Sequence, residues 1–351
     1  MKRFFFLAVA ATAMLAACNK TEIVPTGDAQ EISFVAVNKV ATKAPVDGDA
    51  FLTGDNMDVA AYLAAGDGAT AGTYFKETLF TNVSGTNTWA GKRYWPLSDA
   101  TINFLAVTNT GGGVTDHVQN AFDSAIPASK VVSDLTGNND ATQTDLMFAA
   151  GQGTHQQGAA YTNVSMVFKH ALSWINFKVR TGNGLTDADP KIAINSITLN
   201  NVPVNGTLTV TNGNYATTGA ECVTANLGAT WSFTERVNMK LIESGIVTDA
   251  YADDLLLTKA YNEFGGNGVL VIPSAQTSFT INYTITQPDG TPNTFNYTYN
   301  LADDWTMAKK YVYHITMTLT EILIEPSVAS WGDAIVETFP SLDGQGDDEK
   351  K

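Results

Sequence analysis

Apolar residues recur at every second position along much of the chain. Near its centre they occupy even positions over Val164–Phe168 and odd positions over Ile175–Val179. Side chains alternate across a pleated strand, so each run predicts a strand with one buried face. Because the parity changes between them, one strand is expected to end near Lys169 and the next to start near Ser173 or Trp174. We interpret this joint as the point where one β-domain leads directly into another.

The same alternation predicts a first strand over Glu31–Val37, with Ile32, Phe34 and Ala36 on its buried face. Tyr94-Trp95-Pro96 is typical of a strand end. Further strands or strand-like runs are expected within 51–65, 74–89, 102–106, 145–150, 192–199, 208–210, 269–272, 322–324 and 334–339.

Three local signals refine this pattern. Residues 279–285 and 295–301 alternate on either side of Pro288-Asp289-Gly290, which predicts a hairpin. The parity switch at Asn195-Ser196 indicates a β-bulge or break. In contrast, residues 111–139 have the composition of a long loop, in which we expect a short helix.

The segment from Tyr311 to Leu319 predicts one long amphipathic strand. His314 falls on the polar parity of this strand. We therefore expect His314 to be a surface residue.

Frequent strand signals, few helical patterns and abundant Asn, Gly and Thr turns predict an all-β protein with two tandem β-sandwich domains. The expected domains are residues 30–170 and 171–339. A tether over 18–29 precedes them and a polar tail over 340–351 follows.

The composition excludes some functions. Hydrophobic residues make up 44% of the 351 positions and charged residues 16%, which is enough apolar material for sizeable cores. The formal net charge is −15 with no clusters of Lys or Arg, which disfavours nucleic acid as a partner.

The first residues carry the signals of export. Lys2 and Arg3 precede an apolar run, Phe4–Ala17, that is too short for a permanent membrane span and is typical of a signal peptide over residues 1–17. The run ends in Leu15-Ala16-Ala17-Cys18, which resembles the lipobox of bacterial lipoproteins. That resemblance implies acyl chains on Cys18 and anchoring in the outer membrane. Cys222 is the other cysteine, so no intramolecular disulfide is expected after acylation of Cys18.

No catalytic or metal-binding pattern is evident. The four histidines, His117, His155, His170 and His314, are not spaced as a local metal pair, and the common hydrolase, protease and phosphate-loop motifs are absent. Four acidic residues crowd one region and would suit calcium, but without an EF-hand register we interpret them as solvated turns. They are Asp47, Asp49, Asp55 and Asp58. Four tryptophans beside apolar strands are expected in cores. They are Trp95, Trp174, Trp305 and Trp331.

Several short motifs together resemble the fimbrillin-like family, the type V pilins and related surface lipoproteins of Gram-negative bacteria. Each motif is weak alone, but their order spans nearly the whole mature chain. Besides the segment at Cys18, they are Phe51-Leu52-Thr53-Gly54-Asp55 before Val59-Ala60-Ala61-Tyr62, Tyr94-Trp95-Pro96 with Ile102-Asn103-Phe104-Leu105-Ala106, Gln143-Thr144-Asp145-Leu146-Met147-Phe148-Ala149, Phe168-Lys169-His170-Ala171-Leu172 with Phe177-Lys178-Val179, and Tyr311-Val312-Tyr313-His314-Ile315-Thr316 with Pro326-Ser327-Val328 and Trp331.

The resemblance implies transthyretin-like sandwiches and a structural subunit or tip adhesin of a pilus, with other pilin subunits as partners and no cofactor. In polymerising members a trypsin-like protease removes the first strand, and a neighbour's strand fills the gap. Here the loop offers Lys39 and Lys43 where Arg is frequent, and the expected cut lies between Lys43 and Ala44.

The resemblance also implies a strand that refills this gap. A C-terminal segment of a neighbouring copy is the expected donor, with Ile335 and Phe339 replacing Ile32, Phe34 and Ala36.

Two alternatives remain open at this point. The chain can instead be a monomeric surface lipoprotein that binds glycans through exposed aromatic side chains. Enzymatic activity would need histidines and carboxylates to converge in one cleft. Separately, Asp123-Ser124-Ala125 resembles a bacterial O-glycosylation sequon, with Ser124 as the acceptor.

Overall fold

The computed structural model describes residues 30–38, 51, 53–63, 72–84, 88–110, 128–132, 145–156, 158–182, 188–212, 227–242, 245–247, 255–275 and 278–331. Within these residues every regular element is a β-strand. The predicted all-β class is therefore confirmed.

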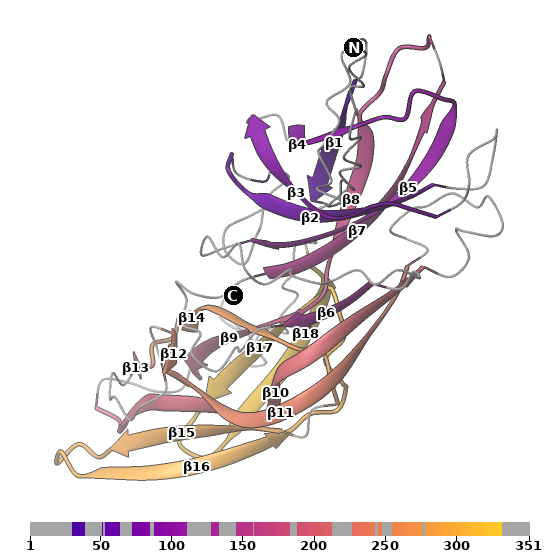
Figure 1. The fold of residues 1–351 in the computed structure, drawn as a ribbon. Helices are drawn as coiled ribbons and strands as arrows, with labels where there is room; N and C mark the ends of the chain where they lie inside the picture. The colour runs from indigo at the N-terminus through magenta and orange to yellow at the C-terminus, as the bar shows by residue number, and fades with distance from the viewer. Residues whose placement is uncertain are drawn as a thin grey trace, which may run out of the picture.

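Strands from the first half of the chain form a closed barrel, the upper body in Figure 1. The path around the barrel is β1-β4-β3-β2-β5-β7-β8, and the pairing of β8 with β1 closes it. The sequence predicted a sandwich here, which has open sheet edges, whereas a closed path has none. The strands are β1 (Glu31–Asn38), β2 (Asn56–Leu63), β3 (Gly72–Ser84), β4 (Thr88–Tyr94), β5 (Ala100–Thr110), β7 (Asp145–His155) and β8 (Val164–His170).

Two sheets make up the lower body, here called the sandwich. One sheet has the order β12-β11-β10-β15-β16, with β13 and β6 also paired to β10, and the other has the order β14-β9-β17-β18. Their strands are β6 (Ala128–Val132), β9 (Ser173–Thr181), β10 (Lys191–Asn212), β11 (Leu227–Ile242), β12 (Gly245–Val247), β13 (Leu255–Leu256), β14 (Asn262–Val271), β15 (Ser278–Thr286), β16 (Pro292–Asn300), β17 (Lys309–Met317) and β18 (Ile322–Ser330).

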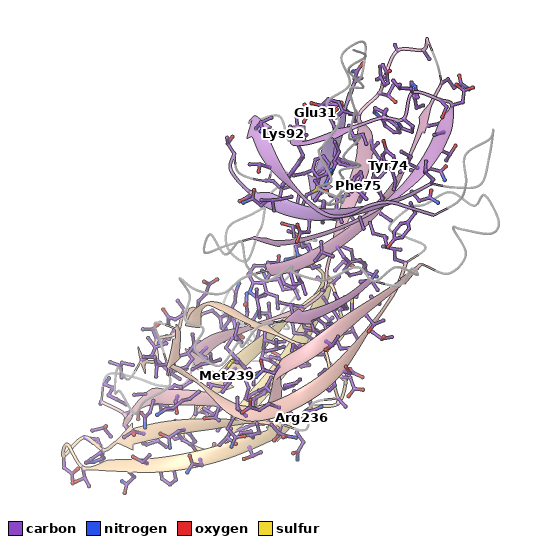
Figure 2. All side chains as sticks on the ribbon, viewed as in Figure 1. Glu31, Tyr74, Phe75, Lys92, Arg236 and Met239 are labelled. Carbon is purple, nitrogen blue, oxygen red and sulfur yellow. The ribbon has the colours of Figure 1, made fainter. Side chains whose placement is uncertain are left out.

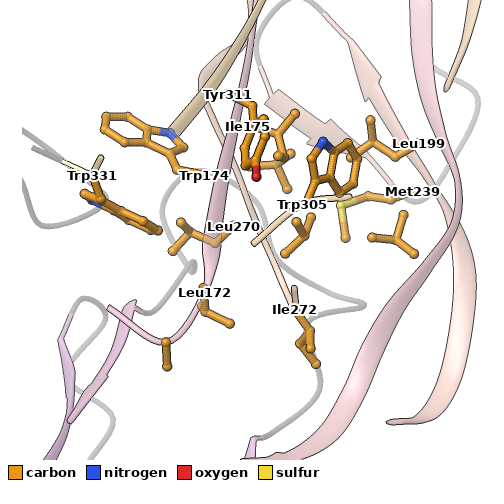
Figure 3. Packing of buried hydrophobic residues seen from close by; sticks show 14 of the residues in the cluster. Leu172, Trp174, Ile175, Leu199, Met239, Leu270, Ile272, Trp305, Tyr311 and Trp331 are labelled. Atoms are coloured by element: carbon orange, nitrogen blue, oxygen red, sulfur yellow. The ribbon is translucent and has the colours of Figure 1, made fainter. Parts of the chain in front are cut away.

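Aromatic side chains join the two sheets of the sandwich. Phe177 from β9 meets Phe279 from β15 edge to face, with ring centroids 5.1 Å apart. The indole N–H of Trp305 donates a 2.8 Å hydrogen bond to the Tyr313 hydroxyl, and burial raises the pKa of that phenol well above its ordinary value. Figure 3 shows Trp305 among Leu199 and Met239 in this core. The bonded indole explains how so large a polar ring is accommodated there.

The predicted joint, bulge and hairpin are all present. Strand β8 ends at His170 and β9 starts at Ser173. The register of β10 against β15 shifts between Ile194 and Ser196. The β15–β16 hairpin turns at Gly290, whose φ is +86°.

Two other segments form additional or longer strands. Of the segment 111–139, in which a short helix is expected, the structure describes residues 128–132, and these form β6, which pairs with β10. The helix stays a prediction for the part of that segment outside the described residues. The strand expected within 322–324 is longer than predicted, because β18 continues through Pro326 to Ser330. As an edge strand, β18 pairs only with β17 and does not need that N–H for a second neighbour.

The prediction that His314 is a surface residue was wrong. His314 is 1% exposed, and every residue from Tyr311 to Met317 is buried. Both faces of β17 are covered, because the Tyr261 ring packs against His314 at 5.3 Å and Arg180 bonds Thr316 on the same parity. The alternation of apolar and polar residues in this strand therefore reflects side-chain polarity and does not indicate which face is exposed.

Strands β2, β5 and β7 have two buried faces that serve different cores. On β5, Phe104 and Ala106 point into the barrel, whereas Leu105 and Val107 belong to the core of the sandwich. Strand β7 repeats this arrangement with Met147 and Phe148. One wall of the barrel thus packs on the sandwich.

A bulge in β14 leads to the first prediction. Gly268 has φ +89°, and a Cβ there would lie 1.6 Å from Asn176 Oδ1 and 2.6 Å from the Ile175 carbonyl. Gly290 has φ +86° but no atom within 4 Å of its virtual Cβ. Gly268→Ala and Gly290→Ala therefore share the left-handed strain of about 1–2 kcal/mol, and only the former adds a backbone clash. In denaturant titrations, we expect Gly268→Ala to lower the free energy of unfolding by at least about 2 kcal/mol more than Gly290→Ala does. Equal losses for both variants would contradict the described packing of β14 on β9.

Candidate strand-exchange site

Strand β1 is the element that closes the barrel. It pairs antiparallel with β4, where Phe34 faces Trp89, and parallel with β8, where Phe34 faces Val164. Strands β4 and β8 therefore both depend on β1 for their hydrogen bonds on one side. Without β1, two unpaired edges would face each other across a gap.

The inward face of β1 fills the barrel core. Ile32, Phe34 and Ala36 are each 0% exposed, as their alternation predicted. The Phe34 ring lies edge to face against Phe80 at 4.8 Å and Phe104 at 5.0 Å. Full burial of an Ile or Phe side chain is worth about 1.5–3 kcal/mol each, so this strand makes a large contribution to barrel stability.

The groove that β1 occupies is apolar and tightly packed. It belongs to a core that includes Phe80, Trp89, Phe104 and Met166. A Cβ at Gly91 on β4 would lie 2.6 Å from the Phe80 ring, so the strand backbone and this ring are in direct contact. An apolar groove between two open edges would accept another strand with inward apolar side chains.

Few polar side chains fix β1 in place. Its Glu31 carboxylate accepts a 2.8 Å hydrogen bond from the backbone N–H of Lys92, which has φ +52° (Figure 2). Ser33 Oγ donates to Asn163 Oδ1. Just before the strand, the Gln30 carbonyl accepts from the backbone N–H of Trp95 at 3.0 Å. Ladder hydrogen bonds and apolar burial therefore supply most of the attachment of β1.

At the same end of β4, the half-buried Tyr74 hydroxyl caps the strand with a hydrogen bond. The Tyr74 hydroxyl donates a 2.7 Å hydrogen bond to the Tyr94 carbonyl. Burial raises the pKa of Tyr74, although the nearby Arg93 charge opposes the shift. Tyr74 therefore remains a neutral donor that stabilises the end of β4.

The C-terminal segment leaves the described part of the chain at Trp331, beside the joint between barrel and sandwich. The Trp331 ring stacks on His170, with centroids 4.2 Å apart and planes at 5°, and its backbone N–H bonds the Ala308 carbonyl at 2.9 Å. Figure 3 shows Trp331 beside Trp174 at the margin of the core. Stacking on His170 thus fixes where the segment after Trp331 starts.

Next to this stack lies a buried, hydrogen-bonded His–Asp pair that sequence reasoning missed. His170 Nδ1 donates to the Asp145 carboxylate at 2.7 Å, and the two side chains are 5% and 1% exposed. Asp145 Oδ1 and His170 Nε2 have no hydrogen-bond partner among the described residues. The two residues start β7 and end β8, so only the distant strand pairing brings them together.

The predicted site residues divide into two groups. Ile32, Phe34 and Ala36 lie together in the barrel. The others fall outside the described residues, namely Cys18, Lys43, Ala44, Ser124, Ile335 and Phe339. The strand-exchange roles of both groups therefore stay predictions.

The described residues hold no group of three or more His, Cys, Asp or Glu side chains that could bind a metal ion. His155 stacks on Tyr161 with centroids 4.9 Å apart, beside a pocket of about 300 Å³ that Trp95 also lines. His170 lies at the joint and His314 against Tyr261, so the described histidines have different neighbours. No helix of the described part has the length and apolarity to cross a membrane.

The prediction of buried tryptophans is confirmed. All four named above are at most 5% exposed, Trp89 is fully buried, and Trp231 is half-buried while its indole bonds the Ala171 carbonyl. Stacking of glycans on exposed tryptophans thus finds no support in this fold.

The second prediction concerns the barrel core. Phe34→Ala should lower the free energy of unfolding by about 3–5 kcal/mol, because the cavity would lie between Phe80 and Phe104. The control is Val35→Ala on the outward, half-buried parity of the same strand, with an expected loss under about 1.5 kcal/mol. Denaturant titration followed by tryptophan fluorescence measures both values. Similar losses for the two variants would show that β1 is not anchored by its inward face.

Comparisons with known proteins place this architecture in context. A Bacteroides uniformis protein assigned to cell adhesion is 18% identical, with 88% of this chain and 99% of that chain covered and a TM-score of 0.45. A fimbrial protein from Bacteroides vulgatus is 14% identical, with 84% of this chain and 99% of that chain covered and a TM-score of 0.45. The fimbrial anchor protein Mfa2 from Porphyromonas gingivalis is 11% identical over 86% and 98%, with a TM-score of 0.34. No curated protein sequence matches this chain.

The sequence was also compared with protein-family models. The fimbrillin-like family matches residues 42–331, which include most of the barrel and the whole described part of the sandwich. The resemblance predicted from short motifs is therefore confirmed. This chain belongs to the fimbrillin-like family.

Proposed function

We propose that this protein is a structural subunit, or an accessory tip subunit, of a surface fimbrium that assembles by strand exchange. The observation that carries the proposal is the position of β1, which completes a closed barrel. Membership of the fimbrillin-like family supports a fimbrial role. In this role the protein acts through its interfaces rather than through catalysis.

The proposed trigger is a proteolytic cut between Lys43 and Ala44. A trypsin-like enzyme accepts Lys, and Pro45 does not directly follow the cut. The cut breaks the covalent link between β1 and the rest of the barrel. Loss of β1 then opens a groove between β4 and β8 that another strand fills by β-addition.

The proposed incoming strand is the C-terminal segment of a neighbouring copy. Twenty residues follow Trp331 in the sequence, and an extended chain of that length spans about 66 Å. Ile335 and Phe339 supply apolar side chains for the space left by Ile32 and Phe34. Because Trp331 is stacked on His170, the segment would extend from a fixed point.

The proposed anchor is a set of acyl chains on Cys18, which would hold the precursor in the outer membrane. Cleavage after Lys43 then removes residues 18–43 together with the lipid. The same cut would therefore release the body of the subunit and free its groove.

Cleavage leads to the third prediction. Brief trypsin treatment of outer-membrane fractions should release a protein whose N-terminus is Ala44, as read by N-terminal sequencing. Lys43→Gln should abolish this release, because the Lys side chain is the recognition element. The matched control Lys39→Gln should leave release unchanged. Release of the same fragment from Lys43→Gln would place the processing site elsewhere.

Deletion of the C-terminal segment leads to the fourth prediction. A chain that ends at Gly332 should be cleaved normally but should form no SDS-resistant ladder, because its neighbours lack the incoming strand. The matched control ends at Phe339 and lacks only the polar tail over 340–351, so it should assemble as the full chain does. A ladder from the shorter chain would eliminate the C-terminal segment as the exchanged strand.

A further inference from the structure

Strand β16 forms an unusual sheet edge. Among the described residues it is the outermost strand of its sheet, and all nine of its residues pair with β15 without a register shift (Figure 1). It has no charged residue, and its one proline, Pro292, is the first position. Eight of its nine residues are exposed, including Phe295 at 43% and Tyr297 at 37%.

The other edges of the described sandwich carry features that hinder pairing. Strand β18 has Glu325 and Pro326 at its centre. The register of β14 is broken between Phe264 and Val269. Three other edge strands are short, because β12 has three residues, β13 two and β6 five. Charges, prolines, bulges and short length are the usual protection against edge-to-edge association. Apart from Pro292 at its first position, β16 has none of these, so among the described edges it is the one most suited to a partner.

Ladders of like side chains cross the outward face beside this edge. Asn195 donates to Asn282 at 2.7 Å, and Asn282 donates to Asn296 at 2.8 Å. Two further ladders run parallel to this one. The Oγ1 atoms of Thr280 and Thr298 lie 3.1 Å apart, and those of Thr284 and Thr294 lie 3.0 Å apart. Each ladder reaches β16 and ends there.

The opposite face of β16 is aromatic. Tyr299 packs on Phe279 in the core, with centroids 5.2 Å apart. Phe295 stacks on Tyr283 at 5.5 Å yet remains partly in solvent, as does Tyr297. The edge therefore presents partly exposed rings on one face and amide and hydroxyl groups on the other.

We infer that two copies of this chain associate through β16, with the strands antiparallel and a two-fold axis at Asn296. This register pairs all nine residues. Phe295 of each copy then faces Tyr297 of the other, and Thr294 faces Thr298. All three ladders would continue across the axis, so the sheets of the two copies become one.

The surface chemistry favours a second copy as the occupant. The chain has a formal charge of −15, which opposes contact between most of its surfaces, but β15 and β16 contain no charge. Identical amide and hydroxyl rows are complementary to themselves in this register. Each copy also covers the exposed ring that the other presents, as aromatic pairs commonly do across strands. This contact is separate from the barrel groove and does not depend on strand exchange.

The contact is expected to be weak for a single pair. Pairing along a nine-residue edge buries less surface than a standard protein–protein interface, which buries about 1,600 Å² in total. Because charge repulsion opposes it, higher ionic strength should strengthen the association. Where many subunits lie along one fibre, repeated contacts of this kind would hold fibres side by side by avidity.

Sedimentation velocity of the full chain, from about 1 µM to 1 mM, tests the association. We expect a concentration-dependent monomer–dimer equilibrium. Asn296→Lys places like charges on the axis and should raise the dimer dissociation constant at least about tenfold. Ser165→Lys, at an exposed position of β8, is the control with the same charge change and should leave the constant within about twofold. Unchanged thermal melting of both variants shows that folding is intact.

Cysteine cross-linking tests the register. Residues on the axis face each other with Cα atoms about 4.5–5.5 Å apart, within disulfide range, so Asn296→Cys should oxidise to a covalent dimer. Thr294→Cys should not, because the two copies of residue 294 lie about 13 Å apart. The parent chain gives the background from Cys222. A chain that stays monomeric, a dimer unaffected by Asn296→Lys, or equal cross-linking at residue 294 would overturn the inference.

Discussion

The double pairing of β1 is the constraint on which the rest of the barrel depends. β1 supplies ladder partners for β4 on one side and β8 on the other, while Phe34 lies between two other rings of the core. A barrel has no edges only while every strand is present, so loss of one strand changes a closed body into an open sheet. Under the proposed strand exchange, loss of β1 is therefore the step that would let another chain bind.

A second constraint links the barrel to the sandwich. Strands β2, β5 and β7 place alternate residues in two cores, so the wall opposite β1 is held firmly on the sandwich. Trp331 stacks on His170 at this joint, and the His170–Asp145 pair lies next to it. The wall that packs on the sandwich does not include β1, so the proposed exchange of that strand would leave the contact between barrel and sandwich in place.

The extent of what sequence could predict follows from the range of each interaction. Alternation identified β1, the joint before Ser173 and the β15–β16 hairpin, because those signals lie within a few residues. It failed for His314, since nothing local shows that Tyr261 covers that face. The contact between Asp145 and His170 depends on the pairing of β7 with β8, which no local pattern shows. The rings of β16 are exposed because that strand has no described neighbour on one side, and the local pattern does not show this either.

The most direct measurement of the central claim is hydrogen exchange of β4 and β8 by mass spectrometry. The chain is compared intact, after cleavage at Lys43 and removal of the released strand, and again with a peptide of the sequence Glu31–Asn38 added back. Our account predicts at least about tenfold faster exchange of amides in β4 and β8 once β1 is gone, with protection restored by the peptide, while β17 stays protected throughout. Protection of β4 and β8 that persists without β1 would contradict it.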